Sequence, residues 1–109
     1  MSDNLKKVIQ TLYMVAKVRG RKKREALLRG MSKDPSIYLA LQEIAYNTLN
    51  KNIKLTLSHH KRLRGYKRLL EELANGIKAK YKKRAVVQSG GFLPVLIPLV
   101  LSILNGLHT

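Results

Sequence analysis

Apolar residues recur at helical spacing along most of the chain, with short polar breaks between the apolar stretches. Apolar positions at i, i+3 and i+4 lie on one face of a helix. This pattern predicts helices over residues 3–18, over a short segment ending at Gly30, over residues 35–50, and from a cap at Thr56 or Ser58 to about Ala74. No segment alternates apolar and polar residues as a half-buried strand does. The sequence therefore predicts an all-α body, a small bundle of about four helices.

The breaks carry helix start and stop signals. Gly20 is predicted to interrupt the first helical stretch. Asp34 can cap a helix while Pro35, at the first helical position, sacrifices no hydrogen bond. Asn75-Gly76 is a stop signal for the fourth helix. We expect these breaks to be the boundaries of the helices.

The chain changes character after residue 76. Residues 77–88 have few apolar anchors and predict either a short helix or an ordered basic arm. Ser89-Gly90-Gly91 then interrupts the chain before an apolar segment, Phe92 to Leu107. We therefore expect a basic helical domain (1–76), a basic arm with a Gly-Gly junction (77–91), and an apolar tail (92–109) that forms a separate C-terminal helix.

Charge is the strongest compositional signal. The 22 Lys and Arg residues against 6 Asp and Glu give a formal net charge of +16, and every Lys and Arg lies between Lys6 and Arg84. Self-repulsion of this size favours a partner that carries many negative charges, such as a nucleic acid or an anionic lipid surface.

Most of the basic residues fall in three clusters, which are the candidate nucleic-acid-binding residues. These are Arg19, Arg21, Lys22, Lys23 and Arg24; Lys61, Arg62, Arg64, Lys67 and Arg68; and Lys78, Lys80, Lys82, Lys83 and Arg84. In one continuous fourth helix, four members of the second cluster would form a basic stripe. Since no base-reading motif is present, we expect contact with phosphates of any sequence. These residues leave DNA and RNA both open as the partner.

Catalytic and metal-binding chemistry is not indicated, so we expect a non-enzyme without a cofactor or metal. The chain has no Cys. His59 and His60 are adjacent, so in a helix their side chains diverge by about 100°. Glu71 and Glu72 are also adjacent rather than facing each other. The five tyrosines are interpreted as packing residues, and none is assigned to a site.

The apolar tail permits three interpretations. It is shorter than the ~20 residues that a membrane-spanning helix needs, and Pro94 and Pro98 interrupt its start. A buried core helix, an interfacial membrane peptide and a docking segment for another protein all fit its composition.

The junction and the tail together resemble a known viral family. The segment from Gly90 to Leu99 resembles the C-terminal part of the adenovirus mu (late core peptide) precursor. A longer arrangement is similar to small basic proteins of Maverick/Polinton elements and adintoviruses. It comprises Ser32-Lys33-Asp34 and Leu55-Thr56 opening helices, then Lys82-Lys83-Arg84, then Val87-Gln88-Ser89-Gly90-Gly91-Phe92-Leu93-Pro94.

This resemblance implies a virion core protein that helps to condense or package double-stranded viral DNA, located in the virion core and the host nucleus. It also implies that Gln88, Ser89, Gly90 and Gly91 form a site for a viral maturation protease, with cleavage after Gly91. Gln88 departs from the aliphatic residue that is usual there, and a simple hinge is the alternative. Capsid proteins or a membrane, contacted through residues 92–109, are further expected partners. They correspond to an alternative function as a membrane-active or capsid-interacting minor virion protein.

Overall fold

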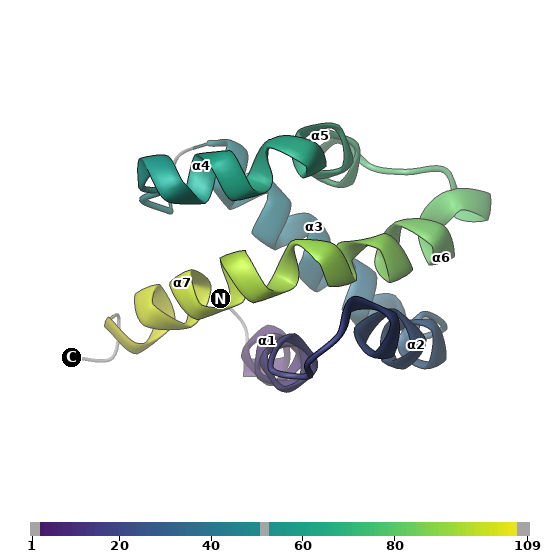
Figure 1. The fold of residues 1–109 in the computed structure, drawn as a ribbon. Coiled ribbons are helices and arrows are strands. Elements are labelled where there is room, and N and C mark those ends of the chain that lie inside the picture. The colour runs from purple at the N-terminus through teal and green to yellow at the C-terminus, as the bar shows by residue number, and fades with distance from the viewer. Residues whose placement is uncertain (1–2, 51–52, 107–109) are drawn as a thin grey trace.

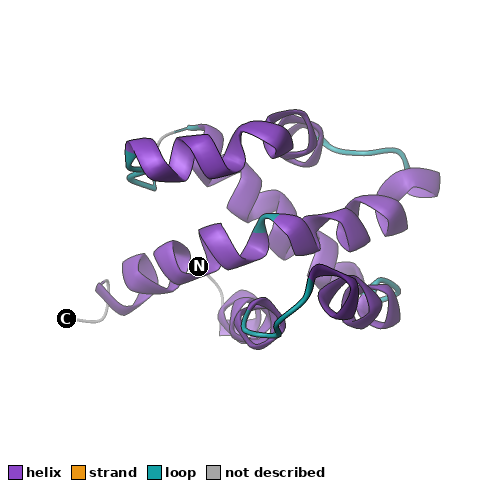
Figure 2. Cartoon of the chain, viewed as in Figure 1, coloured by secondary structure: helices purple, strands orange, loops and turns teal. Residues whose placement is uncertain are grey.

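The computed structural model describes residues 3–50 and 53–106, and these residues are helical with short connections (Figure 2). In chain order the elements are α1 (Asp3–Ala16), α2 (Arg21–Met31), α3 (Pro35–Leu49), α4 (Leu57–Leu63), the 3₁₀ turn η1 (Arg64–Tyr66), α5 (Lys67–Asn75), α6 (Ala79–Gln88), the 3₁₀ turn η2 (Ser89–Gly91) and α7 (Leu93–Gly106). No strand occurs in these two stretches, which confirms the all-α prediction.

The last third of the chain runs through the middle of the molecule. In Figure 1, α6, η2 and α7 follow one another as an almost continuous rod. Helices α1 and α2 lie on one side of this rod and α4 and α5 on the other, while α3 passes behind it. The principal packing contacts are α3 with α5, α1 with α7, and α2 with α6. The C-terminal segment therefore joins the two sides of the fold.

The predicted helix boundaries at Asp34, Thr56 and Gly76 are confirmed. The Asp34 carboxylate accepts hydrogen bonds from the backbone N–H and the hydroxyl of Ser36 at 2.9 and 2.7 Å. The bond from the Ser36 hydroxyl, and to a smaller extent the bond from its backbone N–H, hold the pKa of Asp34 below its usual value. Thr56 caps α4 in a reciprocal capping box with His59. Gly76 follows the end of α5 with φ of 93°, a conformation that favours glycine.

Two predicted boundaries are wrong. Gly30 does not end the second helix, because α2 continues to Met31 and Ser32 is its C-cap. The predicted fourth helix is not continuous, since η1 separates α4 from α5 and the two axes diverge (Figure 1). Gly65 lies at the centre of this break, where the low helix propensity of glycine makes a change of direction inexpensive. Residues 77–88, left open between a helix and an arm, contain α6.

The apolar tail is not a separate helix, contrary to our expectation. Four of its side chains, Phe92, Leu93, Leu96 and Ile97, are fully buried. They belong to the same hydrophobic core as the buried residues of the other helices, among them Ile9, Leu12, Leu28, Leu41, Ile44, Leu70, Leu73 and Val86. The physical reason is that α1 has an apolar face that needs a partner, and α7 packs along it.

Proline does not prevent this helix. Pro94 lies in the first turn of α7, where its missing N–H has no helical partner to lose. Pro98 lies inside the helix, which continues to Gly106. In residues 3–50 and 53–106, no helix has both the length and the apolar character needed to cross a membrane.

Candidate nucleic-acid interface

The first basic cluster flanks and begins α2. Gly20, with φ of 95°, turns the chain into the helix. Arg19, Lys22 and Lys23 are exposed, and Arg21 is exposed while forming an i,i+4 ion pair with Glu25 at 2.8 Å. Exposed pairs of this kind contribute little to stability and are screened by salt. These four cations are therefore available to an external anion.

Arg24 differs from its neighbours because its guanidinium is used inside the protein. It is half-buried, its Nε donates to the Gly90 carbonyl at 2.8 Å, and its Nη1 donates to the Val18 carbonyl at 2.9 Å. These bonds join the start of α2 to the Gly-Gly junction. Arg24 was predicted as a nucleic-acid contact, and the structure gives it a second role as a structural tie.

The second cluster is divided by the break at η1. All five members, Lys61, Arg62, Arg64, Lys67 and Arg68, are exposed. They lie on α4, η1 and α5 rather than on one helix, so the predicted continuous stripe on a single helix is wrong. Arg68 donates to Glu72 at 3.1 Å, and both side chains remain largely exposed.

The third cluster covers the first half of α6 and the residue before it. Lys78, Lys80, Lys82, Lys83 and Arg84 are all exposed, whereas the second half of the helix is anchored in the core by Ala85, Val86 and Val87. The Ile77 backbone N–H donates to the Tyr38 hydroxyl at 2.8 Å, and the Lys82 ammonium lies 4.6 Å from the centre of the Tyr38 ring. The basic end of α6 is thus held against α3.

Two contacts connect the clusters. Helix α2 also packs against α6, but the start of α2 lies at the junction that follows α6, where Arg24 bonds Gly90. The Arg21 guanidinium lies 6.0 Å from the centre of the Tyr66 ring, which joins the first cluster to the second at η1. Arg68 and Arg84, from the second and third clusters, line one groove. We call the exposed members of the three clusters the basic band.

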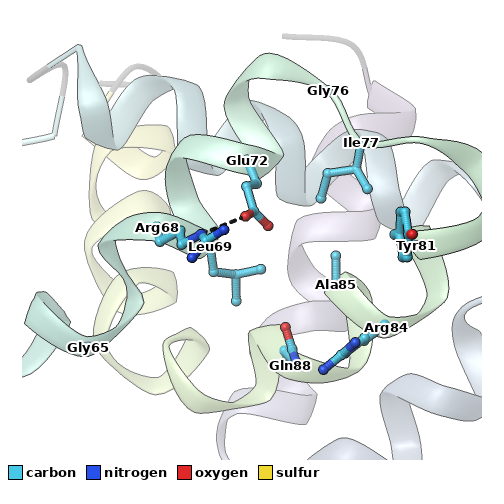
Figure 3. Close-up of a pocket in the computed structure, with 10 residues that line it drawn as sticks. All are labelled: Gly65, Arg68, Leu69, Glu72, Gly76, Ile77, Tyr81, Arg84, Ala85 and Gln88. Atoms are coloured by element: carbon cyan, nitrogen blue, oxygen red, sulfur yellow. Dashed lines mark hydrogen bonds and ion pairs between the residues drawn. The ribbon is translucent and has the colours of Figure 1, made fainter.

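The groove lies between α5 and α6 and has a volume of about 690 Å³. Figure 3 shows Arg68, Leu69 and Glu72 on the α5 side, and Tyr81, Arg84 and Gln88 on the α6 side. Sequence reasoning treated Tyr81 as a packing residue, yet its side chain is 47% exposed. Only the tertiary arrangement that places α5 opposite α6 could reveal this groove, because its walls are separated in sequence.

The candidate processing site lies at the junction of α6 and α7. Gln88 is exposed, Ser89 and Gly90 are buried, and Gly91 is half-buried. The Ser89 hydroxyl donates to the Val86 carbonyl, and the four residues follow helical or 3₁₀ geometry. Both glycines pack closely against side chains of other elements, Gly90 against α2 and Gly91 against Tyr66. A Cβ on Gly91 would lie 2.6 Å from two ring carbons of Tyr66, and one on Gly90 would lie 3.3 Å from Leu28 Cδ1.

The residues considered for catalysis have structural surroundings. The Nδ1 atom of His59 accepts a hydrogen bond from the Thr56 backbone N–H at 3.1 Å, within the capping box. His60 is exposed, and Glu72 bonds Arg68. In the part of the chain that the structure describes, no three His, Asp or Glu side chains lie together as metal ligands would.

Comparison with known proteins adds no family assignment: no protein-family model, no curated protein and no solved structure matches the chain.

Proposed function

We propose that this protein is a non-enzymatic, sequence-independent nucleic-acid-binding protein that packages double-stranded DNA. The observation that carries the proposal is that three exposed basic clusters, separate in sequence, are linked through Tyr66 and through the groove between α5 and α6 into one band over α2, α4, α5 and α6. A band that joins several helices can follow a phosphate backbone over several nucleotides, whereas isolated charges cannot.

The charge balance also supports a polyanionic partner. The basic band contains fourteen exposed cations, and two of them form ion pairs with Glu25 and Glu72. Phosphates that contact the others would release condensed counterions, which is the main source of sequence-independent affinity. The exposed side chains reach phosphates without any base contact, so we expect little dependence on sequence.

Location in a virion core and the host nucleus is part of the proposal. It rests on the resemblance of residues 90–99 to the mu precursor, and of the longer arrangement from Ser32 to Pro94 to small basic proteins of Maverick/Polinton elements and adintoviruses. Processing after Gly91 rests on the same resemblance. The interaction of the tail with a membrane or capsid would require α7 to leave the core, since Phe92, Leu93, Leu96 and Ile97 are buried there. We therefore do not advance that alternative.

The test is a salt titration of affinity for unrelated DNA duplexes. If about 6 phosphates are neutralised, the affinity should fall by about 10³ between 50 and 200 mM salt and should differ little among sequences. An affinity that does not change with salt would contradict the proposal. If the protein binds an RNA duplex more tightly than a DNA duplex, its partner is RNA and not DNA.

A charge-matched pair of variants separates the basic band from net charge. The Lys23→Gln/Lys83→Gln variant removes two exposed cations of the band, while Lys7→Gln/Lys54→Gln removes two exposed cations outside the three clusters. Each lost phosphate contact should lower the slope of log affinity against log salt by about 1. We expect a loss of about 2 for the band variant and less for the control. Equal losses would mean that net charge, not the band, determines binding.

A further inference from the structure

The groove between α5 and α6 has a chemistry that the phosphate backbone of a duplex does not require. Its lining combines polar side chains with an apolar part, in which Leu69, Ile77 and Ala85 lie between the two helices (Figure 3). A duplex backbone presents phosphates and sugars but no accessible base face, so it makes little use of the apolar part of this lining. An unpaired base presents a flat apolar face and a polar edge, which fits an apolar groove with polar margins.

Two arginines border the groove from opposite sides. Arg68 comes from α5 and Arg84 from α6. The Glu72 carboxylate also lines the groove, and Arg68 Nε holds it at 3.1 Å, so its charge is partly neutralised. Among the described residues, Arg84 forms no hydrogen bond or ion pair that would occupy its guanidinium. The margins are therefore suited to a phosphodiester, which guanidinium groups bind strongly.

An aromatic ring and an amide complete the site. In Figure 3 the Tyr81 ring is seen edge-on, so one of its faces is turned toward Ile77 and Ala85. The Lys80 ammonium lies 5.0 Å from the centre of this ring and adds positive charge beside it. Gln88, on the same helix, carries both a donor and an acceptor that can meet the edge of a base. Stacking on an aromatic ring tolerates any base, because every base has a π-face.

We propose that this groove binds one unpaired nucleotide of a single-stranded nucleic acid. Its base lies against Leu69, Ile77 and the Tyr81 ring, and its phosphate lies between Arg68 and Arg84. The inference rests on the proposed nucleic-acid-binding function and extends it. The basic band holds phosphates of any strand, whereas the groove makes the protein favour strands whose bases are accessible, such as ends, gaps and unwound segments.

The first experiment compares two single strands that differ only in their bases. Fluorescence anisotropy would measure the affinity of the full chain for an oligothymidylate of about 12 nucleotides and for an abasic strand of the same length. Both strands carry the same phosphates, so the band binds them equally. One stacked base should make the oligothymidylate bind about 5-fold or more tightly. Equal affinities would overturn the inference.

The second experiment places the preference in the groove with matched variants. Tyr81→Ala removes the stacking ring, and Tyr46→Ala removes a tyrosine of similar exposure (54%) on α3, outside the groove. We expect Tyr81→Ala to reduce the ratio of the two affinities to about 1, and Tyr46→Ala to leave it unchanged. The same ratio in both variants would overturn the inference. Circular dichroism would check that both variants are folded.

A second pair tests the phosphate contact, and duplex DNA separates the two proposals. Arg84→Gln should weaken single-strand binding more than Lys83→Gln, although each removes one exposed charge from α6, because only Arg84 lines the groove. Equal weakening would contradict the assigned phosphate position. Loss of the base preference in Tyr81→Ala with duplex affinity retained supports the groove site. Absence of salt-dependent duplex binding in the unmodified protein would instead refute the proposed function itself.

Discussion

Helices α6 and α7 are consecutive parts of one rod, yet they have opposite relations to the rest of the molecule. The first six residues of α6 include Lys80, Lys82, Lys83 and Arg84, all exposed. Helix α7 has no Lys, Arg, Asp or Glu in its sequence, and its first turns are buried against α1. The residues between them, Ser89–Gly91, are packed against α2 and Tyr66.

This difference shows that a segment at the end of the chain can be essential for folding. The charged helix exposes its basic side chains and buries only Ala85, Val86 and Val87, whereas the uncharged terminal segment supplies the largest fully buried side chain, Phe92. We therefore expect changes in α7 to alter folding and changes in α6 to alter binding.

Truncation after Gly91 should have the largest effect. It removes four fully buried side chains, Phe92, Leu93, Leu96 and Ile97. Loss of one such side chain typically costs about 2–5 kcal/mol, and the free energy of unfolding of a whole domain is about 5–15 kcal/mol. The truncated chain should therefore show no cooperative thermal transition by circular dichroism and no dispersed NMR spectrum. A cooperative transition in the truncated chain would show that α7 is the separate element first expected.

The burial of the junction also affects the proposed cleavage after Gly91. If a protease cuts after Gly91, the junction must first open, because Ser89 and Gly90 are buried. Loss of the segment from Phe92 onward would then leave a basic chain that lacks part of its core. Slow cleavage in the folded protein and rapid cleavage in partly denaturing urea would be the corresponding observation.

Gly91→Ala should have an intermediate effect. The new Cβ would lie 2.6 Å from the Cε1 and Cζ atoms of Tyr66, so the junction or the ring must move. Such overpacking costs about 1–3 kcal/mol, measurable by urea denaturation. Gly30→Ala is the matched control, because Gly30 lies within α2 and its Cβ would meet nothing within 4 Å. That substitution should stabilise the protein by up to about 1 kcal/mol.

A Tyr66 variant tests whether the ring of Tyr66 causes the loss of stability in Gly91→Ala. In a Tyr66→Ala background the close contact is absent, so Gly91→Ala should lose most of its penalty. An unchanged penalty would mean that the backbone of η2, rather than the ring of Tyr66, requires glycine.

Local signals in the sequence predicted much of the fold because they act within one turn of chain. Asp34 before Pro35 and Thr56 before α4 determine helix starts through bonds to nearby backbone N–H groups. Gly20 and Gly76 adopt positive φ where the chain changes direction. The break at Gly65 was missed because Leu63, Leu70 and Leu73 keep helical spacing across it, and all three are buried on either side of the change in direction.

The remaining features depend on contacts between segments that are distant in sequence. The composition of residues 92–107 was equally compatible with a core helix, a membrane peptide and a docking segment, and only the apolar face of α1 decides among them for the described residues. Arg24 could not be distinguished from Lys23, since its partners Val18 and Gly90 are set by the tertiary fold. The groove likewise depends on α5 lying beside α6, which no local pattern indicates.

Arg24→Gln and Lys83→Gln compare a cation bonded inside the protein with an exposed one. Each variant removes one positive charge from a predicted binding cluster, and we expect these to be the smallest effects. Arg24→Gln loses charge-assisted hydrogen bonds to the Val18 and Gly90 carbonyls and should lower the free energy of unfolding by about 1–3 kcal/mol. Lys83 is exposed, so Lys83→Gln should change the free energy of unfolding by less than about 0.5 kcal/mol. Its effect should appear instead in the salt dependence of DNA affinity, with a slope lower by about 1. Urea denaturation and anisotropy on the same samples would measure both quantities. Equal effects of the two variants on stability would show that the tie between α2 and the junction contributes nothing, and that charge alone governs both positions.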